Sequence, residues 1–163
     1  ISLRPMPEMD IVKGLMLHYY IGYGEANVDK TNPNAESVRQ RMSFGLSFDH
    51  DYILLLGQYL MTEDGFDSDK TKIAKGAGYS VSTRIKLEKL LDSNETGLFF
   101  RYDNYDPNTD KDKDGKNIII VGPYYYFING KAAIGLNYTK EMFEDTEKNK
   151  DISQVILQAL VSY

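Results

Sequence analysis

The chain of 163 residues lacks cysteine and tryptophan and has only two histidines. Without cysteine, neither a disulfide framework nor a thiolate metal site can form. No apolar run reaches the ~18 residues that a membrane-spanning helix requires, because the longest, residues 52–61, is interrupted by Gly57 and Gln58. The net charge of −5 argues against a nucleic-acid-binding protein. These features argue against a disulfide-stabilised protein, a thiolate metalloprotein, a helical membrane protein and a nucleic-acid-binding protein. We expect residues 1–163 to form a single structural unit.

Alternation of apolar and polar residues is the strongest positive signal. Within residues 38–48, one face receives Val38, Gln40, Met42, Phe44, Leu46 and Phe48, and the other receives Arg39, Arg41, Ser43, Gly45 and Ser47. Residues 14–24, 77–87, 97–103, 132–141 and 154–163 alternate in the same way. The first face, which we name the apolar face, carries no charge in these six segments apart from Lys140 near the end of one of them, and its only uncharged polar residues are Gln40 and Thr83. A helix cannot produce a period of two, so the segments are predicted strands with an apolar face and a polar face.

Two further strands are expected near residues 52–62 and 117–128, but both are apolar on each side, so their facing stays open. Pro123 removes a backbone donor from the second and predicts a bulge or a local irregularity there. Residues 1–5 are expected to be a strand stub. The chain thus contains about eight strands plus a stub, and since single-chain bacterial barrels have an even number of strands, we expect it to be part of a larger barrel.

The segments between the strands supply a second signal. They fall near residues 6–11, 25–36, 49–51, 63–75, 90–95, 105–116, 129–130 and 143–151. Short and long connections alternate, which collects the long hydrophilic ones at one end, as in outer-membrane barrels. With the C-terminus at the periplasmic side, Phe48, Phe127 and Tyr163 fall at one rim of the apolar face, and Tyr23, Tyr79, Tyr102 and Tyr138 lie toward the other. Two aromatic belts are expected where rings meet lipid headgroups.

These patterns predict an all-β fold, an antiparallel transmembrane β-barrel in a bacterial outer membrane. A soluble ligand-binding barrel also alternates, with its apolar face inward. The connection lengths, the aromatic rims and the glycine, serine and arginine content of the polar face favour lipid contact instead. A third alternative is a small non-conducting eight-strand barrel with an anchoring or adhesive role, whose lumen is filled by side chains.

Several motifs resemble a known family. Residues 97–110, GLFFRYDNYDPNTD, resemble the ARYDYYDPNTD stretch near the C-terminus of porins of the phosphate-selective porin O and P group and related porins. Residues 118–126 and 133–138 are similar to the strands that follow in those proteins, and residues 1–5 with Gly14 and Leu15 resemble an internal segment. Residues 158–163 are similar to the C-terminal insertion signal of barrel proteins, with Tyr163 in place of the usual phenylalanine.

The resemblance implies the C-terminal half of a Gram-negative porin with about sixteen strands, often a trimer. It implies a passive channel for small hydrophilic solutes or anions. The barrel-assembly machinery would insert it into a membrane of lipid and lipopolysaccharide, and it implies no cofactor.

Basic residues are the candidate pore-lining groups. The polar face carries Arg39, Arg41, Arg84, Lys86 and Arg101, and Arg4 joins them if the stub is a strand. Fixed positive charges replace part of the hydration of a passing anion, which predicts an anion-preferring pore. The alternative is that these side chains pair with carboxylates and serve the fold. Both interpretations stay open at this point.

Other candidate sites are weaker. Asp110, Asp112 and Asp114 with Gly115 match the first half of a calcium loop, but Val121 stands where that loop needs a bidentate glutamate. A solvated turn is the expectation, with weak surface Ca²⁺ binding as the alternative. His18 and His50 have no serine, cysteine or carboxylate motif beside them, so no catalytic residue and no enzyme activity are expected.

Overall fold

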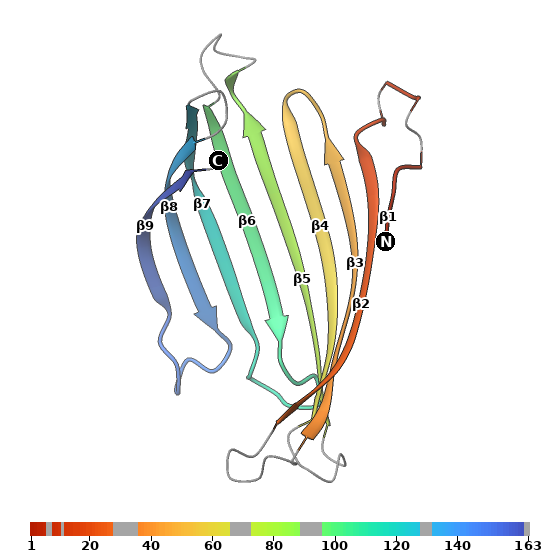
Figure 1. The fold of residues 1–163 in the computed structure, drawn as a ribbon. Coiled ribbons are helices and arrows are strands. Elements are labelled where there is room, and N and C mark those ends of the chain that lie inside the picture. Colours follow the sequence, from red (N-terminus) through yellow and green to blue (C-terminus); the bar gives the residue numbers. More distant parts are fainter. Residues whose placement is uncertain are drawn as a thin grey trace.

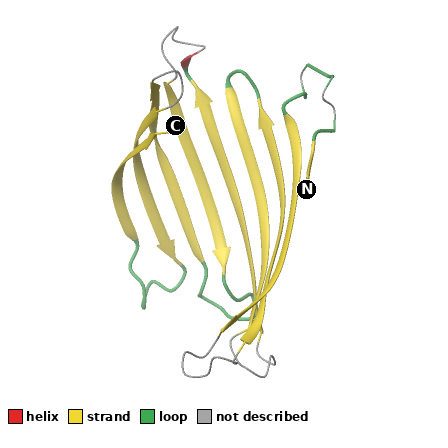
Figure 2. Cartoon of the chain, in the orientation of Figure 1, coloured by secondary structure: helices red, strands yellow, loops and turns green. Residues whose placement is uncertain are grey.

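The structure, a computed structural model, describes residues 1–5, 8–10, 12–27, 36–65, 73–88, 96–127 and 132–161. Its regular elements are strands joined into one antiparallel sheet in sequence order (Figures 1 and 2). They are β1 (Ser2–Leu3), β2 (Leu15–Asn27), β3 (Glu36–Asp49), β4 (Ile53–Gly65), β5 (Ile73–Lys86), β6 (Thr96–Asp106), β7 (Lys116–Phe127), β8 (Ala132–Phe143) and β9 (Ile152–Val161). The described residues contain no helix long and apolar enough to cross a membrane.

The all-β prediction and the strands predicted from alternation are confirmed. Leu46 pairs with Leu17 on β2, so the apolar residues of β2 and β3 lie on one side of the sheet. The same phase continues to the far edge, where Leu136 pairs with Leu157. Because side chains alternate with a period of two, this register keeps the apolar face continuous from β1 to β9.

The register also settles the facing of β4 and β7, which the sequence left open. Tyr59 of β4 lies between Phe44 and Tyr79, and it therefore belongs to the apolar face. Val121 of β7 lies between Phe100 and Tyr138 and belongs to the same face. The polar face consequently receives Leu54, Leu56, Gln58, Leu60 and Thr62 from β4 and Ile118, Ile120, Gly122, Tyr124 and Tyr126 from β7. This face is more apolar over these two strands than over β3 or β5.

Pro123 interrupts the sheet without shifting it. The paired residues of β7 and β8 run from Lys116 to Val121 and resume at Tyr124, and the register is the same on both sides of the gap. Proline has no N–H to donate to the ladder. The predicted irregularity is present, therefore, as a lapse in pairing and not as an inserted residue.

The sheet is not closed into a barrel: β1 and β9 are its two edges. In an antiparallel sheet, strands of odd position run in one direction, so β1 and β9 are parallel to each other. An antiparallel barrel cannot be completed by joining those two edges directly. The predicted antiparallel strands are present, and closure of the described strands is not.

The predicted alternation of short and long connections is only partly present. The strands extend further than the alternation indicated, for example to Gly65 in β4 and Asp106 in β6. The short turn at residues 50–52 lies at the end of the sheet where β1 and β5 also end (Figure 1), and 11 and 9 residues separate these two strands from β2 and β6 in the sequence. Segments 107–115 and 144–151 lie at the opposite end. The long connections are therefore not confined to one end.

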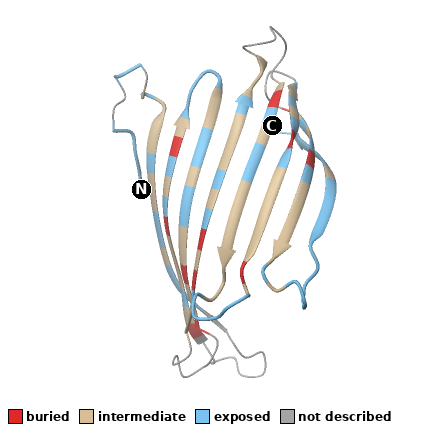
Figure 3. Cartoon of the chain, turned by 180° about the vertical axis from the view of Figure 1, so that it is seen from behind, coloured by how far each residue is buried: buried red, intermediate tan, exposed pale blue. Residues whose placement is uncertain are grey.

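Burial in this sheet is inverted relative to a soluble domain. Among the described residues, Ala132 is the only buried apolar side chain. Ser43, at 7% exposure, is buried on the polar face, whereas Phe44 beside it is 48% exposed on the apolar face. Figure 3 shows exposed stretches along the middle of the strands. Soluble proteins bury residues such as phenylalanine and leucine and expose polar ones.

The stub β1 is held by a histidine between two serines. Nδ1 of His18 lies 2.9 Å from Oγ of Ser2, and Nε2 of His18 lies 2.8 Å from Oγ of Ser47. The backbone of Ile1 forms hydrogen bonds in both directions with Tyr19. His18 therefore links β1, β2 and β3 on the polar face.

We expect His18→Ala to loosen β1, because each lost hydrogen bond contributes about 1 kcal/mol. Amide hydrogen exchange at Tyr19, which donates to the Ile1 carbonyl, should accelerate. His50→Ala, in the turn between β3 and β4, is the matched control and should leave that amide unchanged. Unaltered exchange at Tyr19 in His18→Ala would contradict the proposed tether.

Candidate functional site

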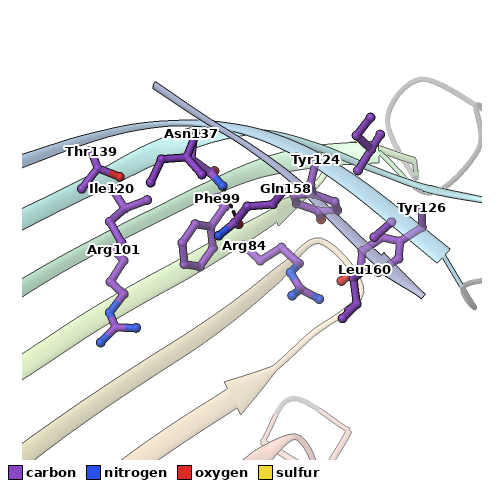
Figure 4. A pocket seen from close by; sticks show the side chains of 14 residues that line it. Arg84, Phe99, Arg101, Ile120, Tyr124, Tyr126, Asn137, Thr139, Gln158 and Leu160 are labelled. Atoms are coloured by element: carbon purple, nitrogen blue, oxygen red, sulfur yellow. Dashed lines mark hydrogen bonds between the residues drawn. The ribbon is translucent and has the colours of Figure 1, made fainter. Parts of the chain in front are cut away.

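The polar face is hollow. A cavity of about 720 Å³ lies against β1 to β6 and is lined by residues that include Ser2, His18, Ser43, Gln58 and Ser82. A second cavity, of about 370 Å³, lies against β5 to β9 (Figure 4). Phe99 and Arg101 line both of them. The two cavities thus form one concave surface on the polar side of the curled sheet.

Small residues shape the first half of this surface. Gly45 and Ser43 of β3, with Ser80 and Ser82 of β5, line the larger cavity. A Cβ added at Gly45 would lie 3.4 Å from the Cβ of His18, in van der Waals contact with it. Small side chains leave room for solvent above the sheet and leave polar hydroxyls to meet it.

Arg39 and Arg41 converge on one carboxylate that the sequence analysis did not include. Arg39 Nη1 lies 2.8 Å from Asp64 Oδ1. Arg41 donates to both oxygens of Asp64, at 2.7 and 3.0 Å. Such bidentate contacts between arginine and a carboxylate are among the strongest ion pairs in proteins. The sequence analysis missed Asp64 for two reasons. It left open which residues of β4 face which side of the sheet, and it assigned residue 64 to a connection.

Two of the other predicted basic residues are also paired. Lys86 Nζ lies 2.6 Å from Asp49 Oδ1, and Arg101 Nε lies 2.8 Å from Asp103 Oδ2. Arg4 lies just beyond β1 and reaches the sulfur of Met16 at the edge of the sheet. The pairing supports the alternative in which most of these basic residues neutralise carboxylates on the same face.

The basic residues do not meet at one constriction. Arg41 is opposite Thr62 near one end of the strands, and Thr62 is opposite Gly76. Arg84 lies eight residues further along the same strand as Gly76, which corresponds to about 26 Å. The basic side chains are therefore spread along the full height of the sheet.

Arg84 differs from the others. Its guanidinium carbon lies 5.1 Å from the centre of the Tyr124 ring and 5.5 Å from that of Tyr126. These are cation–π distances. Within the described part of the chain, Arg84 forms no salt bridge with a carboxylate. Among the polar-face cations on strands β2 to β9, Arg84 is thus the one without a carboxylate partner in the described part of the chain, and it lies in the smaller cavity (Figure 4).

The aspartates of the calcium-like segment do not form a metal centre. Among the described residues, no cluster of three or more histidine or acidic side chains could hold a metal ion. Asp110 and Asp112 are exposed. Burial raises the pKa of Asp114 above its ordinary value, and the nearby carboxylate of Asp106 raises it further.

The histidine contacts were missed by the sequence analysis, which found no serine beside His18. Ser2 and Ser47 are distant in the sequence and meet His18 only through strand pairing. A neutral imidazole can accept one serine proton, but in the described residues no carboxylate contacts His18 to orient it. We therefore assign His18 to the tether of β1.

Aromatic residues gather at the end of the sheet near the turn at 50–52. Tyr125 and Phe127 stack with 6.2 Å between ring centres, and Phe48 stacks on His50 at 6.0 Å. The predicted insertion signal, Tyr163, lies outside the described residues. Tyr79 and Tyr102, expected toward the opposite rim, contact each other at 5.8 Å on the apolar face.

No protein-family model matches the chain, and no curated protein and no solved structure shows significant similarity to it. The resemblance to the porin O and P group therefore depends on short motifs alone, chiefly residues 97–110.

We expect Asp64→Asn to lower the free energy of unfolding by about 2 kcal/mol, because it removes a shared, partly buried partner of two guanidinium groups. Guanidinium chloride unfolding of the chain in detergent micelles measures the change. Asp49→Asn is the matched control, since Asp49 is an exposed partner of Lys86 and its loss should cost less than about 1 kcal/mol. Equal effects of the two variants would contradict the importance given to Asp64.

Proposed function

We propose that this chain forms part of the wall of a bacterial outer-membrane porin, a passive channel for small hydrophilic solutes. The apolar face would meet lipid and the polar face would line a water-filled lumen. The observation that carries the proposal is the inverted burial: large apolar side chains are exposed on one continuous face, and small polar ones are buried on the other.

The exposed face would be costly in water. Leu46, Val81 and Leu136 are 46%, 48% and 49% exposed, and they belong to a face that continues over all nine strands. Burying a side chain of this kind contributes about 1.5–3 kcal/mol. Soluble monomers rarely expose a contiguous apolar patch of this extent. Lipid covers such a surface without requiring a matching protein.

The direction of curvature argues against a soluble ligand-binding barrel. In such a barrel the apolar face is inside and the polar face meets water. Here the two cavities lie on the side of Ser43, Ser82 and Asn137, and the side chains of the apolar face, such as Phe44 and Val81, lie on the opposite side of the sheet. The backbone is compatible with a membrane as well, because neighbouring strands satisfy each other's hydrogen-bonding groups.

A non-conducting barrel is the second candidate. The polar face carries Leu56 and Leu60 on β4 and Ile156 and Leu160 on β9, and Leu160 is 64% exposed. Apolar side chains on the hollow side favour a lumen filled by other groups over one filled by water.

Orientation can be tested with paired substitutions. Leu46→Arg should cost about 2–4 kcal/mol if the site lies near the middle of the bilayer. Gln58→Arg, on the polar face of the neighbouring strand, is the matched control and should cost far less. Spin labels at Phe44 and Ser43 should be quenched by lipid-soluble and water-soluble agents respectively, and the reverse pattern would refute lipid contact of the apolar face.

Conductance tests the channel itself. The closed barrel whose wall this chain is proposed to form, refolded and added to a planar lipid bilayer, should produce discrete current steps in potassium chloride. Insertion without current would favour the filled barrel. Failure to associate with lipid vesicles, with the chain remaining in solution without detergent, would refute both membrane functions.

A further inference from the structure

Arg84 stands in surroundings unlike those of the other cations on the polar face. Arg39, Arg41, Lys86 and Arg101 each lie within 3 Å of a carboxylate oxygen. The guanidinium of Arg84 instead lies over the rings of Tyr124 and Tyr126. The rings hold the charge in place but do not neutralise it, and the N–H groups in the plane of the guanidinium are suited to a two-pronged contact with an anion.

Apolar side chains form much of the wall of the cavity beside Arg84. Phe99 projects from β6 next to Arg84, and Ile120, Ile156 and Leu160 are among the other residues that line the cavity. Figure 4 shows the side chains of Arg84, Arg101 and Phe99 extending to the same side of the sheet. A volume of about 370 Å³ is at the lower end of the range of small-molecule sites.

Small residues keep this cavity open. Ala133 and Gly135 of β8 line it where larger side chains would fill it. A Cβ added at Gly135 would make only ordinary contacts, 3.6 Å from the Pro123 carbonyl oxygen and 3.7 Å from Asn137 Nδ2. A larger residue is therefore tolerated by the backbone at Gly135 and would extend into the empty space.

An amide pair lies at the edge of the same cavity. Asn137 Nδ2 donates to Gln158 Oε1 at 2.9 Å (Figure 4). Because the oxygen of Gln158 is the accepting atom, its own amide N–H groups remain as donors. They supply polar contacts near a bound ligand without adding charge.

We propose that this cavity binds small organic anions that combine a carboxylate with a flat apolar body, such as aromatic carboxylates. The carboxylate contacts the guanidinium of Arg84, and the ring packs against Phe99 and the aliphatic lining. The inference deepens the proposed pore, since it assumes that solutes reach the polar face. An inorganic anion such as phosphate fits less well, because a single uncompensated cation among apolar side chains cannot replace its hydration.

Calorimetric titration of the refolded chain in detergent micelles tests the site without requiring conduction. Benzoate should bind saturably. Acetate, which lacks the ring, benzyl alcohol, which lacks the charge, and inorganic phosphate should each bind at least about tenfold more weakly. This is the factor expected for losing the apolar burial of the ring or a charged hydrogen bond. Equal affinities for benzoate, acetate and phosphate would overturn the proposal.

Two variants test whether benzoate binds in this cavity. Arg84→Gln should weaken benzoate binding about tenfold. Gly135→Leu should weaken it similarly by filling the cavity while Arg84 remains. Lys140→Gln makes the same change of charge on the apolar face and should leave the affinity unchanged. If one cavity variant fails to refold, the other still decides the outcome, and unchanged benzoate affinity in a folded cavity variant would refute the assignment.

The proposed binding site and the proposed channel can be refuted independently of each other. Benzoate binding that depends on Arg84, together with absence of current in a bilayer, would leave the site and reject the channel. Discrete current steps with a flat benzoate titration would leave the channel and reject the site.

Discussion

The fold depends on one register kept in phase across every pair of neighbouring strands. A slip of one residue between any two of them would turn the side chains beyond that point to the opposite side. Pairs such as Leu17 with Leu46 and Leu136 with Leu157 show that no such slip occurs between β2 and β9. Because the register holds, one side of the sheet keeps a continuous apolar surface, and the other side carries the two cavities described above together with Asp64, Arg41 and Arg84.

This sorting explains where the charged groups find partners. On the polar face, charges from adjacent strands are brought within reach of each other, so Asp64 lies between Arg39 and Arg41, and Lys116 Nζ lies 2.9 Å from Glu141 Oε1. Arg84 is an exception because its cross-strand neighbours are Leu54 and Phe99. The same pairing rule that neutralises most cations thus leaves one beside apolar and aromatic side chains.

The alternation within each segment predicted the strands well, but it predicted less well which side of the sheet their residues face and which side chains they contact. Alternation is a property of a single segment, so the strands near 38–48 and 77–87 could be recognised without knowing their neighbours. The facing of β4 and β7 could not, because both sides of those strands are apolar and only the pairing of Tyr59 and Val121 decides it. Contacts such as Ser2 with His18, or Arg41 with Asp64, depend on register between strands, which the sequence of either strand alone does not contain.

The outer edge of β9 has a consequence for whatever completes this sheet. On that side, no described strand lies beside residues 152–161, and Leu157 and Val161 are exposed. In a hydrocarbon layer, each unsatisfied N–H or C=O group costs several kcal/mol. Apolar side chains alone cannot meet that need. In the proposed membrane setting, a strand beside β9 is therefore selected first by its main chain, which must be extended to satisfy these groups, and only then by its side chains.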